Sequence, residues 1–357
     1  MSFTYGSDKK SAVQAKHDAQ KIAFAPIMFQ AAKALRDLGI LQYLMDKKKK
    51  NKDIESIAEH LHLSVYGVKV LLEAGLSLEM VLVEDEQWAL TKTGYFILSD
   101  ELTKVNMDFT NDVNYLGFFH LKEAIKNGKP EGLKVFGNWD TVYEGLAELP
   151  EDVRKSWFSF DHYYSDYAFP EIMPFLFKDN LKKIMDVGGN TGKFSIFCAN
   201  YDKDVKMTIL DLPGQVNDAL KNIAERDLSD RIDAIPVNLL DQTAPFPKGY
   251  DAIWMSQFLD CFSQDEILGL LKRSYDALDD NGSLFILETY WDKQKYAAST
   301  YSLHATSLYF TAIANGNSQM YHSRDMERLI NRSGLYIDEV VENIGMSHTL
   351  FKCKRKK

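Results

Sequence analysis

A glycine-rich turn is the first part of the sequence whose residue types suit a chemical task. Asp-Val-Gly-Gly-Asn-Thr-Gly occupies residues 186–192, after the apolar segment 183–187 and before a helical pattern that begins at Lys193. A strand that turns tightly into a helix leaves backbone N–H groups facing a ligand, and glycines there allow a positive φ and a close approach. The turn therefore predicts a site where the backbone holds a ligand.

A carboxylate stands at the end of the next predicted strand. Residues 206–210 lead directly to Asp211, which is followed by Leu212, a proline and a glycine. A carboxylate in this place can accept hydrogen bonds from both ribose hydroxyls of a nucleoside. NAD-binding enzymes share such a glycine turn, but the spacing here differs from their G-x-G-x-x-G pattern. The turn and Asp211 together favour a nucleoside-containing ligand over an ordinary glycine turn.

Strand and helix patterns alternate around these residues. Five strands are predicted, at residues 183–187, 206–210, 232–237, 250–255 and 283–288, and a helical pattern follows the first, second and fourth of them. Ser263 and Glu266 form a capping box at the start of one helix. Such alternation specifies a mostly parallel sheet with helices on both faces. The C-terminal half is therefore predicted to be a doubly wound α/β domain.

The N-terminal third has the spacing of a winged helix. Its predicted elements are an amphipathic helix at 27–44, short helices at 54–61 and 65–76, and a hairpin at 80–90. Ser64 is placed to cap the second short helix. That helix carries one cation, Lys69, and one anion, Glu73, whereas a helix in the major groove normally brings several basic or amide side chains. The module is therefore predicted to pair with a second copy rather than to bind DNA.

A helical segment rich in aromatic residues joins the two parts. We expect a winged-helix dimerisation domain at 1–104, this connector at 105–177 and an α/β domain at 178–357. The connector's aromatic rings either form core packing or wall a pocket for a flat acceptor, since stacking suits flat substrates. Residues 309–315 likewise form either the core side of a helix or part of the wall of the acceptor pocket.

Composition and charge exclude several other classes of protein. The 357 residues carry a net charge of −9, which argues against a general nucleic-acid partner. Two basic clusters, 47–50 and 352–357, are interpreted as solvated loops or chain ends. No apolar run reaches the roughly 18 residues that a membrane span requires. The three cysteines lie far apart, with no His at ligand spacing, so we expect no disulfide framework, no metal site and a cytoplasmic location.

Longer motifs resemble one known family. DVGGNTGKF at 186–194, LDLPG at 210–214 and the region from DAIWM to DALDDNGSLFILE at 251–288 resemble the two-domain plant-type O-methyltransferases, which include caffeic acid and acetylserotonin O-methyltransferases. The resemblance implies a Rossmann-like fold and S-adenosylmethionine as methyl donor. It also implies a small aromatic hydroxylated acceptor and a homodimer in which each N-terminal domain helps to close its partner's acceptor pocket.

The resemblance also assigns cofactor-binding positions. Gly188 would approach the amino-acid end of the cofactor, Asp211 would hold the ribose, and Asn190 replaces the customary middle glycine. Asn238 and Leu239 take the place of the Asp-Met or Asp-Phe pair against the adenine. Ser256 stands where the plant enzymes have a lysine. The complete predicted set is Asp186, Gly188, Asn190, Gly192, Asp211, Leu212, Asn238, Leu239 and Ser256.

The catalytic base departs from the family pattern. Family members have a His-Asp-Trp run whose His removes the acceptor proton, but this sequence has Asp260 at the His position, within Leu-Asp-Cys-Phe. The carboxylate that orients the base is retained as Glu288, whereas Tyr321 stands near the place of a second family glutamate. Proton transfer from a phenol is roughly 3–4 kcal/mol less favourable to an ordinary Asp than to a His. Burial beside Glu288 could recover much of this difference by raising the pKa of Asp260.

Three functions remain open at this point. The first is O-methylation with Asp260, His162 or His304 as base, and it is favoured. The second is C-methylation of a ring carbon ortho to a phenol, with Asp260 bonded to the hydroxyl. The third is a catalytically inactive cofactor-binding dimer with a structural or regulatory role, which the intact glycine turn and Asp211 count against.

Overall fold

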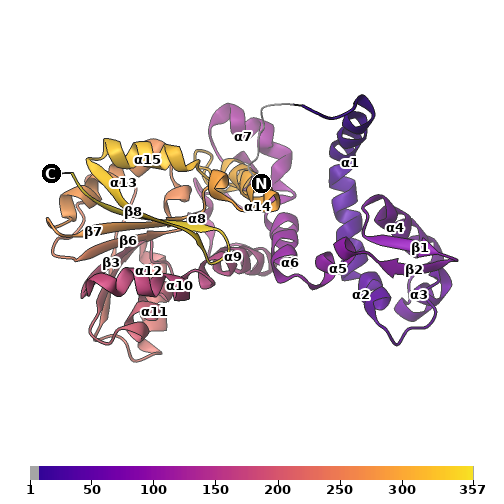
Figure 1. The fold of residues 1–357 in the computed structure, drawn as a ribbon, viewed down its shortest axis with the longest axis horizontal. Helices are drawn as coiled ribbons and strands as arrows, with labels where there is room; N and C mark the ends of the chain where they lie inside the picture. The colour runs from indigo at the N-terminus through magenta and orange to yellow at the C-terminus, as the bar shows by residue number, and fades with distance from the viewer. Residues whose placement is uncertain (1–7, 357) are drawn as a thin grey trace. The chain divides into compact units, whose positions relative to one another are not determined.

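The computed structural model describes residues 8–356, which divide into two compact units (Figure 1). The N-terminal unit ends at Asn111 and the C-terminal unit begins at Asp112. Each unit has a hydrophobic core of its own. The finer division into three parts, at residues 104 and 177, stays a prediction.

The N-terminal unit has the predicted helix-turn-helix and hairpin. Its elements are α1 (Ala12–Asp37), α2 (Ile40–Met45), α3 (Ile54–Leu61), α4 (Val65–Ser77), β1 (Val81–Glu84), β2 (Gln87–Leu90), α5 (Lys92–Ser99) and α6 (Glu101–Asp108). Ser64 caps α4 as predicted, since its Oγ accepts a hydrogen bond from the Gly67 amide at 3.0 Å. The β1–β2 turn places Asp85 and Glu86 at φ 46° and 58°, the left-handed pair that a tight hairpin turn requires.

The single helix predicted at 27–44 is wrong in its bounds. The chain is helical from Ala12 to Asp37 and again from Ile40 to Met45. Gly39 separates the two helices at φ +82°, a left-handed conformation that only glycine adopts without strain. The apolar periodicity continues across the break because buried residues of both helices, including Leu35 and Leu41, enter one core.

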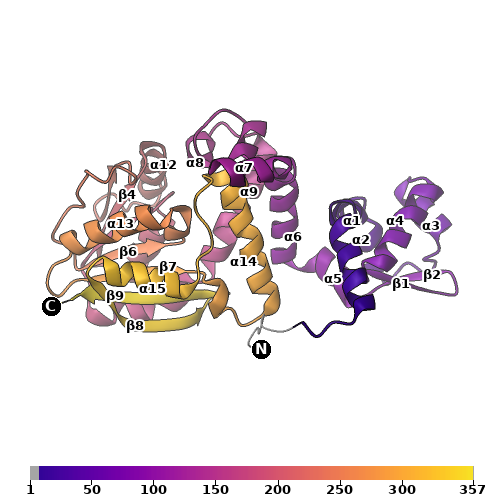
Figure 2. The ribbon, with the colours of Figure 1, turned by 90° about the horizontal axis from the view of Figure 1, so that it is seen from above.

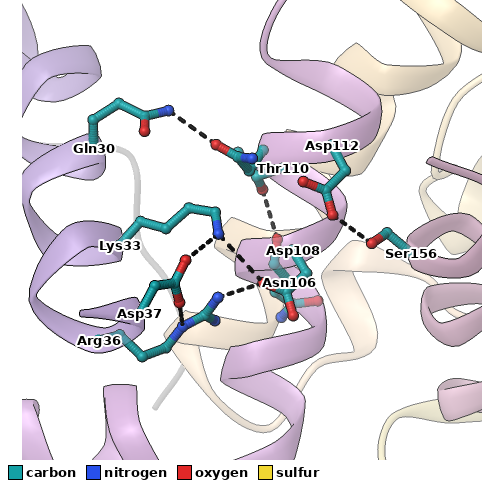
Figure 3. Close-up of polar contacts among 10 residues, drawn as sticks. Gln30, Lys33, Arg36, Asp37, Asn106, Asp108, Thr110, Asp112 and Ser156 are labelled. Atoms are coloured by element: carbon teal, nitrogen blue, oxygen red, sulfur yellow. Dashed lines mark hydrogen bonds and ion pairs between the residues drawn. The ribbon is translucent and has the colours of Figure 1, made fainter. Parts of the chain in front are cut away.

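Polar side chains tie α1 to the segment that follows α5. Arg36 donates to Asp108 and, through Nε, to Asp37 Oδ1 at 2.7 Å, while Gln30 Nε2 donates to Asn111 Oδ1 at 3.0 Å (Figure 3). Hydrogen bonds that join charged groups are stronger than neutral ones. These contacts therefore fix α6 against α1 within the N-terminal unit.

The C-terminal unit is built on a seven-stranded sheet. Its strands are β3 (Lys183–Val187), β4 (Lys206–Asp211), β5 (Ile232–Pro236), β6 (Ala252–Ser256), β7 (Ser283–Glu288), β8 (Leu335–Ile344) and β9 (His348–Arg355). The order is β5-β4-β3-β6-β7-β9-β8. The pairs from β5 to β7 are parallel, and β9 pairs antiparallel with both β7 and β8. All five strands predicted from the sequence are confirmed.

Helices cover both faces of this sheet, as predicted (Figure 1). On one face, α13 (Gln264–Ala277) and α15 (Ser323–Arg332) pack on a core that includes Met185, Met255 and Ile286. On the other face, α10 (Phe169–Leu176), α11 (Lys193–Tyr201) and α12 (Pro213–Ala224) pack on a core that includes Ile184 and Trp254. Alternate residues of each strand therefore enter different cores.

The interpretation of residues 352–357 as a solvated chain end is wrong for the first four of them. They belong to β9, which lies between β7 and β8. Lys352 is 6% exposed, pairs with Asp179 and lies over the Phe285 ring. A lysine can enter a sheet in this way because its long alkyl chain packs on apolar surface while its ammonium reaches a carboxylate.

A group of short helices lies beside the sheet (Figure 2). Its α-helices are α7 (Leu121–Asn127), α8 (Val142–Gly145), α9 (Glu151–Asp166) and α14 (Ala297–Tyr309). Shorter helical turns are η1 (Phe109–Asn114), η2 (Gly117–His120), η3 (Glu131–Val135), η4 (Phe177–Asp179), η5 (Leu259–Cys261), η6 (Trp291–Lys293) and η7 (Phe310–Ala314). The Trp157 indole donates to the Tyr309 hydroxyl at 2.7 Å, which ties α9 to α14.

The described part of the chain has neither a membrane-spanning helix nor a cluster of metal ligands. Among residues 8–356, no helix has both the length and the apolar character that crossing a membrane demands. In the same range, no group of three or more His, Cys, Asp and Glu side chains is arranged to hold a metal ion.

Candidate functional site

The glycine turn joins β3 to α11 in a conformation that requires its residue types. Gly188, Asn190 and Gly192 have φ angles of +76°, +48° and +79°, all in the left-handed region that glycine, and less readily asparagine, adopts. A Cβ on Gly188 would lie 2.2 Å from the Phe258 ring. The turn is therefore closely packed beneath, and its backbone can be approached by a ligand.

Asp211 fastens this turn to the end of β4. Its Oδ2 accepts a hydrogen bond from the Asn190 amide at 2.7 Å, and its Oδ1 accepts one from the Leu212 amide at 2.7 Å. Each carboxylate oxygen has a second lone pair and can accept a further bond. Burial raises the pKa of Asp211. Asp211 thus holds the loop, a role that the sequence analysis missed, and could still accept ribose hydroxyls.

Asp186 lies beneath the turn. It is 3% exposed, and its Oδ2 accepts a hydrogen bond from Ser195 Oγ at 2.7 Å. Burial raises the pKa of Asp186 to about 7, and the charge of Asp211 adds to the rise. This hydrogen bond indicates that Asp186 stabilises the start of α11. Ser195 stands three residues beyond Gly192 on a helix of apolar core residues, and no pattern in the sequence identified it.

The remaining predicted cofactor residues follow β5 and β6. Asn238 is exposed, and its Oδ1 accepts a hydrogen bond from the Leu240 amide at 3.0 Å. Leu239 is buried, and its carbonyl accepts a hydrogen bond from Arg273. Ser256 is the half-buried last residue of β6. All nine predicted residues thus lie at or just beyond the carboxyl ends of four adjacent strands, where ligands bind in open α/β sheets.

Arg273 is a second residue that the sequence analysis missed. It lies on α13, and its Nη1 also donates to the carbonyl oxygens of Asp241 at 3.0 Å and Ala244 at 3.2 Å. Its guanidinium lies 4.7 Å from the centre of the Phe246 ring. Arg273 therefore holds the loop after β5. In the sequence it is one charged residue on an amphipathic helix and gives no signal of this role.

Asp260 and Glu288 lie at the ends of the neighbouring strands β6 and β7. Asp260 is 8% exposed on the turn η5, and Glu288 is 2% exposed as the last residue of β7. Glu288 Oε1 accepts hydrogen bonds from the amides of Phe258 at 3.0 Å and Leu259 at 2.8 Å. Glu288 thus holds the backbone that carries Asp260, whereas the sequence analysis expected it to orient the Asp260 side chain.

Two further side chains hold the same turn. Asn315 Nδ2 donates to the Cys261 carbonyl at 2.6 Å, and the Tyr321 hydroxyl donates to the Phe262 carbonyl at 2.6 Å. The Asn315 amide is oriented in turn by Ser318, whose Oγ donates to Asn315 Oδ1 at 2.9 Å. Segment 258–262 is therefore fixed by one side chain from the end of β7 and two from the connection between η7 and α15. We call Glu288, Asn315 and Tyr321 the clamp.

Burial dominates the electrostatics around Asp260. It raises the pKa of Asp260 to about 7, and the charge of Asp161 on α9 adds to the rise. The pKa of Glu288 is also raised, by burial first and then by the charge of Asp260. The Cys261 thiol lies 3.5 Å from Asp260 Oδ1 and shares a hydrogen bond with Tyr143. Asp260 is thus a carboxylate whose proton affinity approaches that of an imidazole.

The two alternative bases have other contacts. The His162 ring lies 4.0 Å from Asp161 and against Phe158, at 5.6 Å between ring centres. His304 is exposed and packs on Trp291, at 5.0 Å between ring centres. Asp260 is therefore the buried candidate near the glycine turn. Phe258, two residues before Asp260, packs against Gly188 of that turn.

Two family models match the chain. A Dimerisation2-like domain matches residues 16–88, and an O-methyltransferase domain matches residues 118–336. L-tyrosine C(3)-methyltransferase of Streptomyces lavendulae is 26% identical over 317 residues, covering 88% of this chain and 85% of its own length. Bacteriochlorophyllide d C-20 methyltransferase of Chlorobaculum tepidum is 24% identical over 294 residues, covering 81% and 83%.

A solved structure shares the fold over nearly the whole chain. The S-adenosylmethionine-dependent methyltransferase SibL, in its apo form, has a TM-score of 0.72 at 22% identity, covering 95% of this chain and 99% of its own. The resemblance stated from the sequence motifs is thereby confirmed, as are the Rossmann-like fold and the N-terminal dimerisation domain.

Proposed function

Because this chain belongs to the O-methyltransferase domain family and is an S-adenosylmethionine-dependent methyltransferase, we propose that it methylates a small hydroxylated aromatic acceptor. Asp260 holds the hydroxyl of this acceptor. The observation that carries the proposal is a buried carboxylate on a segment that the clamp fixes and that packs against the glycine turn through Phe258. One of the relatives is named for its action on L-tyrosine, a phenol, which supports an acceptor of this kind.

The residues of the glycine turn fit the cofactor. A Cβ at Gly188 would collide with the Phe258 ring, so only glycine fits here, and Phe258 supports the turn on that side. Gly188 would face the amino-acid end and Asp211 the ribose, while Asn238 and Leu239 would border the adenine. When bound, S-adenosylmethionine supplies a methyl group on a positively charged sulfur. The protein contributes chiefly by positioning the acceptor in line with that methyl group and excluding water.

Asp260 handles the acceptor proton. With a pKa raised by burial, it can accept the proton or a short hydrogen bond from a phenolic hydroxyl, which an ordinary aspartate would do weakly. The clamp keeps the carboxylate in place because each of its bonds goes to the backbone of segment 258–262. In the first candidate reaction the hydroxyl oxygen receives the methyl group, as in the O-methyltransferases for which the family is named.

A second candidate is methylation of the ring carbon ortho to that hydroxyl. One observation favours it: two relatives that match 88% and 81% of this chain, at 26% and 24% identity, are named for transfer to carbon, whereas acetylserotonin O-methyltransferase of Homo sapiens matches 81% at 21% identity. An Asp in the place of the family's His is compatible with this chemistry. A hydrogen bond from the hydroxyl to Asp260 gives the ring phenolate character without requiring complete proton transfer.

The decisive experiment is methyl transfer from labelled S-adenosylmethionine to a panel of phenols, with NMR of the products. An O-methyl signal identifies the first reaction and a ring C-methyl signal the second. Cofactor binding without turnover of any phenol would contradict the proposal and support an inactive cofactor-binding dimer. The panel should include catechols and simple phenols, since both present a hydroxyl to Asp260.

We propose that the N-terminal unit forms a homodimer, in line with its match to a dimerisation domain. Helix α1 presents exposed apolar side chains, including Ile22 at 75% and Ile27 at 65% exposure. The double change Ile22→Glu and Ile27→Glu is expected to convert a dimer into monomers in sedimentation velocity. Leu220→Glu, which introduces the same charge at an exposed position of α12, is the control. A monomeric wild-type protein would contradict the proposal.

Tyr321→Phe tests the clamp. The change removes only the hydroxyl that donates to the Phe262 carbonyl, and one such bond contributes about 0.5–1.5 kcal/mol. We expect kcat to fall about twofold to tenfold, with an unchanged Kd for S-adenosylmethionine in calorimetry. Tyr275→Phe on α13 is the matched control. Equal losses of kcat and cofactor affinity would indicate general damage to the fold instead.

The compartment and the other partners remain proposals. We place the enzyme in the cytoplasm, a location that its three free cysteines support. A nucleic-acid partner is not proposed, because the net charge is −9. The failure of the dimer to retard DNA at moderate salt would agree with this view.

A further inference from the structure

The loop that follows β5 lies beside the carboxylate proposed to hold the ribose. The Val237 amide donates a hydrogen bond to the Asp211 carbonyl at 2.8 Å, and Asn238 is the next residue of the chain. The glycine turn, Asp211 and this loop follow β3, β4 and β5, which are neighbours in that order. Methionine, ribose and adenine are joined in the same order in S-adenosylmethionine. We therefore expect residues 238–246, which we name the β5 loop, to border the adenine.

One side chain of α13 holds the β5 loop. Arg273 is 8% exposed, and its Nη2 donates to the Leu239 carbonyl. Its Nη1 donates to the carbonyls of Asp241 at 3.0 Å and Ala244 at 3.2 Å. A planar guanidinium can bond several carbonyls at once, which a lysine ammonium on a flexible chain does less well. Arg273 therefore fixes the β5 loop at several points along its backbone.

The peptide group between Leu239 and Leu240 passes this constraint to Asn238. The carbonyl of this peptide accepts the bond from Arg273, and its N–H donates to Asn238 Oδ1 at 3.0 Å. An N–H group bonds to the amide oxygen and not to the amide nitrogen, so this contact also fixes which way the Asn238 side chain is turned. Asn238 is exposed, and its NH₂ group can donate to a ligand. The ring nitrogens of adenine accept such bonds.

We propose that Arg273 positions the adenine of S-adenosylmethionine, because it holds the peptide group that turns the Asn238 NH₂ group toward a ring nitrogen of the base. The inference rests on the proposed function, which places Asn238 at the adenine. Arg273 is a positioning residue: its hydrogen bonds go to the backbone of the β5 loop, and it acts on the cofactor through Asn238.

Arg273→Met tests the inference by removing these bonds while keeping a long side chain in the core. We expect the Kd for S-adenosylmethionine, measured by calorimetry, to rise about threefold to tenfold, the effect of one hydrogen bond. The value of kcat at saturating S-adenosylmethionine should stay unchanged, because the clamp holds segment 258–262 without Arg273. Lys272→Met, which removes a charge from the exposed neighbouring position of α13, is the control and should keep the wild-type Kd.

A double-mutant cycle distinguishes positioning from general stabilisation of the fold. Asn238→Ala removes the proposed adenine contact and should raise the Kd about threefold to tenfold. Since Arg273 acts through Asn238, the double variant should bind the cofactor about as tightly as the weaker single variant. Independent effects would multiply instead and raise the Kd about 10- to 100-fold. Arg273→Lys, whose ammonium holds the three carbonyls less well, should give a smaller rise and replaces Arg273→Met in the cycle if that variant does not fold.

Three results would overturn the inference. They are an unchanged Kd in both variants of Arg273, effects that multiply in the cycle, and equal losses of kcat and cofactor affinity. The proposed function is tested separately, since calorimetry with S-adenosylmethionine needs no acceptor. Effects that do not multiply, in an enzyme that methylates no phenol, would support the role of Arg273 and contradict the proposed function. Methylation of a phenol by an enzyme whose Kd does not respond to Arg273 would do the reverse.

Discussion

Replacing Asp260 with asparagine is expected to lower kcat by about 10²- to 10⁴-fold, the range for loss of a general base or of an equivalent charged hydrogen-bond partner. Asparagine keeps the size of the side chain but cannot accept a proton. Affinity for S-adenosylmethionine should change little, because the glycine turn is held by Asp211 rather than by Asp260. The measurements are kcat with labelled cofactor and Kd by calorimetry.

The same substitution should not unfold the protein. The clamp bonds to the backbone of segment 258–262 and uses no atom of the Asp260 side chain. The pKa of Asp260 is raised in the folded state, so its ionisation opposes folding above pH 7, and its removal relieves repulsion with Glu288 and Asp161. We expect the Tm of Asp260→Asn at pH 8 to equal or exceed that of the wild-type enzyme.

The pH profile provides an internal check of this assignment. Below pH 7 Asp260 is protonated and cannot accept a proton, so wild-type kcat/KM should rise as the pH increases through about 7. The residual activity of Asp260→Asn should lack this rise. Asp265→Asn, which changes an exposed carboxylate at the start of α13, should match the wild-type enzyme. Full activity in Asp260→Asn would exclude Asp260 as base and turn attention to His162.

Local patterns were sufficient to predict the cofactor half of the fold. The strands β3 and β7 begin and end at the predicted residues, because a buried parallel strand reads as a short apolar run bounded by turn residues. The hairpin β8–β9 was not predicted. Its last strand contains Lys352, which is buried and whose charge is accommodated by Asp179, a residue distant in sequence. Such compensation between distant residues gives no local signal.

In the candidate site, too, local patterns could be predicted and contacts between distant residues could not. Gly188, Gly192 and Asp211 could be identified because a backbone turn and a carboxylate after a strand have fixed positions in the sequence. The partners that hold Asp260 could not, since Asn315 and Tyr321 lie 54 and 59 residues away from the carbonyl groups that they bind. Tyr321 was noted only as a residue near the place of a missing glutamate. Its hydroxyl donates to the Phe262 carbonyl, a contact that no sequence pattern indicated.

Asp211→Asn is expected to have the largest effect on the cofactor, raising the Kd for S-adenosylmethionine by about 10²- to 10⁴-fold. The carboxylate accepts one amide on each oxygen, from Asn190 and Leu212. Asparagine offers one oxygen and one NH₂ group, so one of these amides would face a donor and the glycine turn would open. The charged partner of the ribose hydroxyls would be lost as well. Calorimetry with S-adenosylmethionine and S-adenosylhomocysteine measures both losses.

The pattern of effects distinguishes Asp211 from Asp260. Asp218→Asn, on the exposed face of α12, removes the same charge nearby and should leave the Kd unchanged. Since we propose that Asp211 binds the cofactor and Asp260 the acceptor, we expect kcat of Asp211→Asn at saturating S-adenosylmethionine to recover much further than that of Asp260→Asn. An unchanged cofactor Kd in Asp211→Asn would show that the turn holds its conformation without this carboxylate. The backbone of the turn at Gly188, which packs against Phe258, would then be the main determinant of cofactor binding.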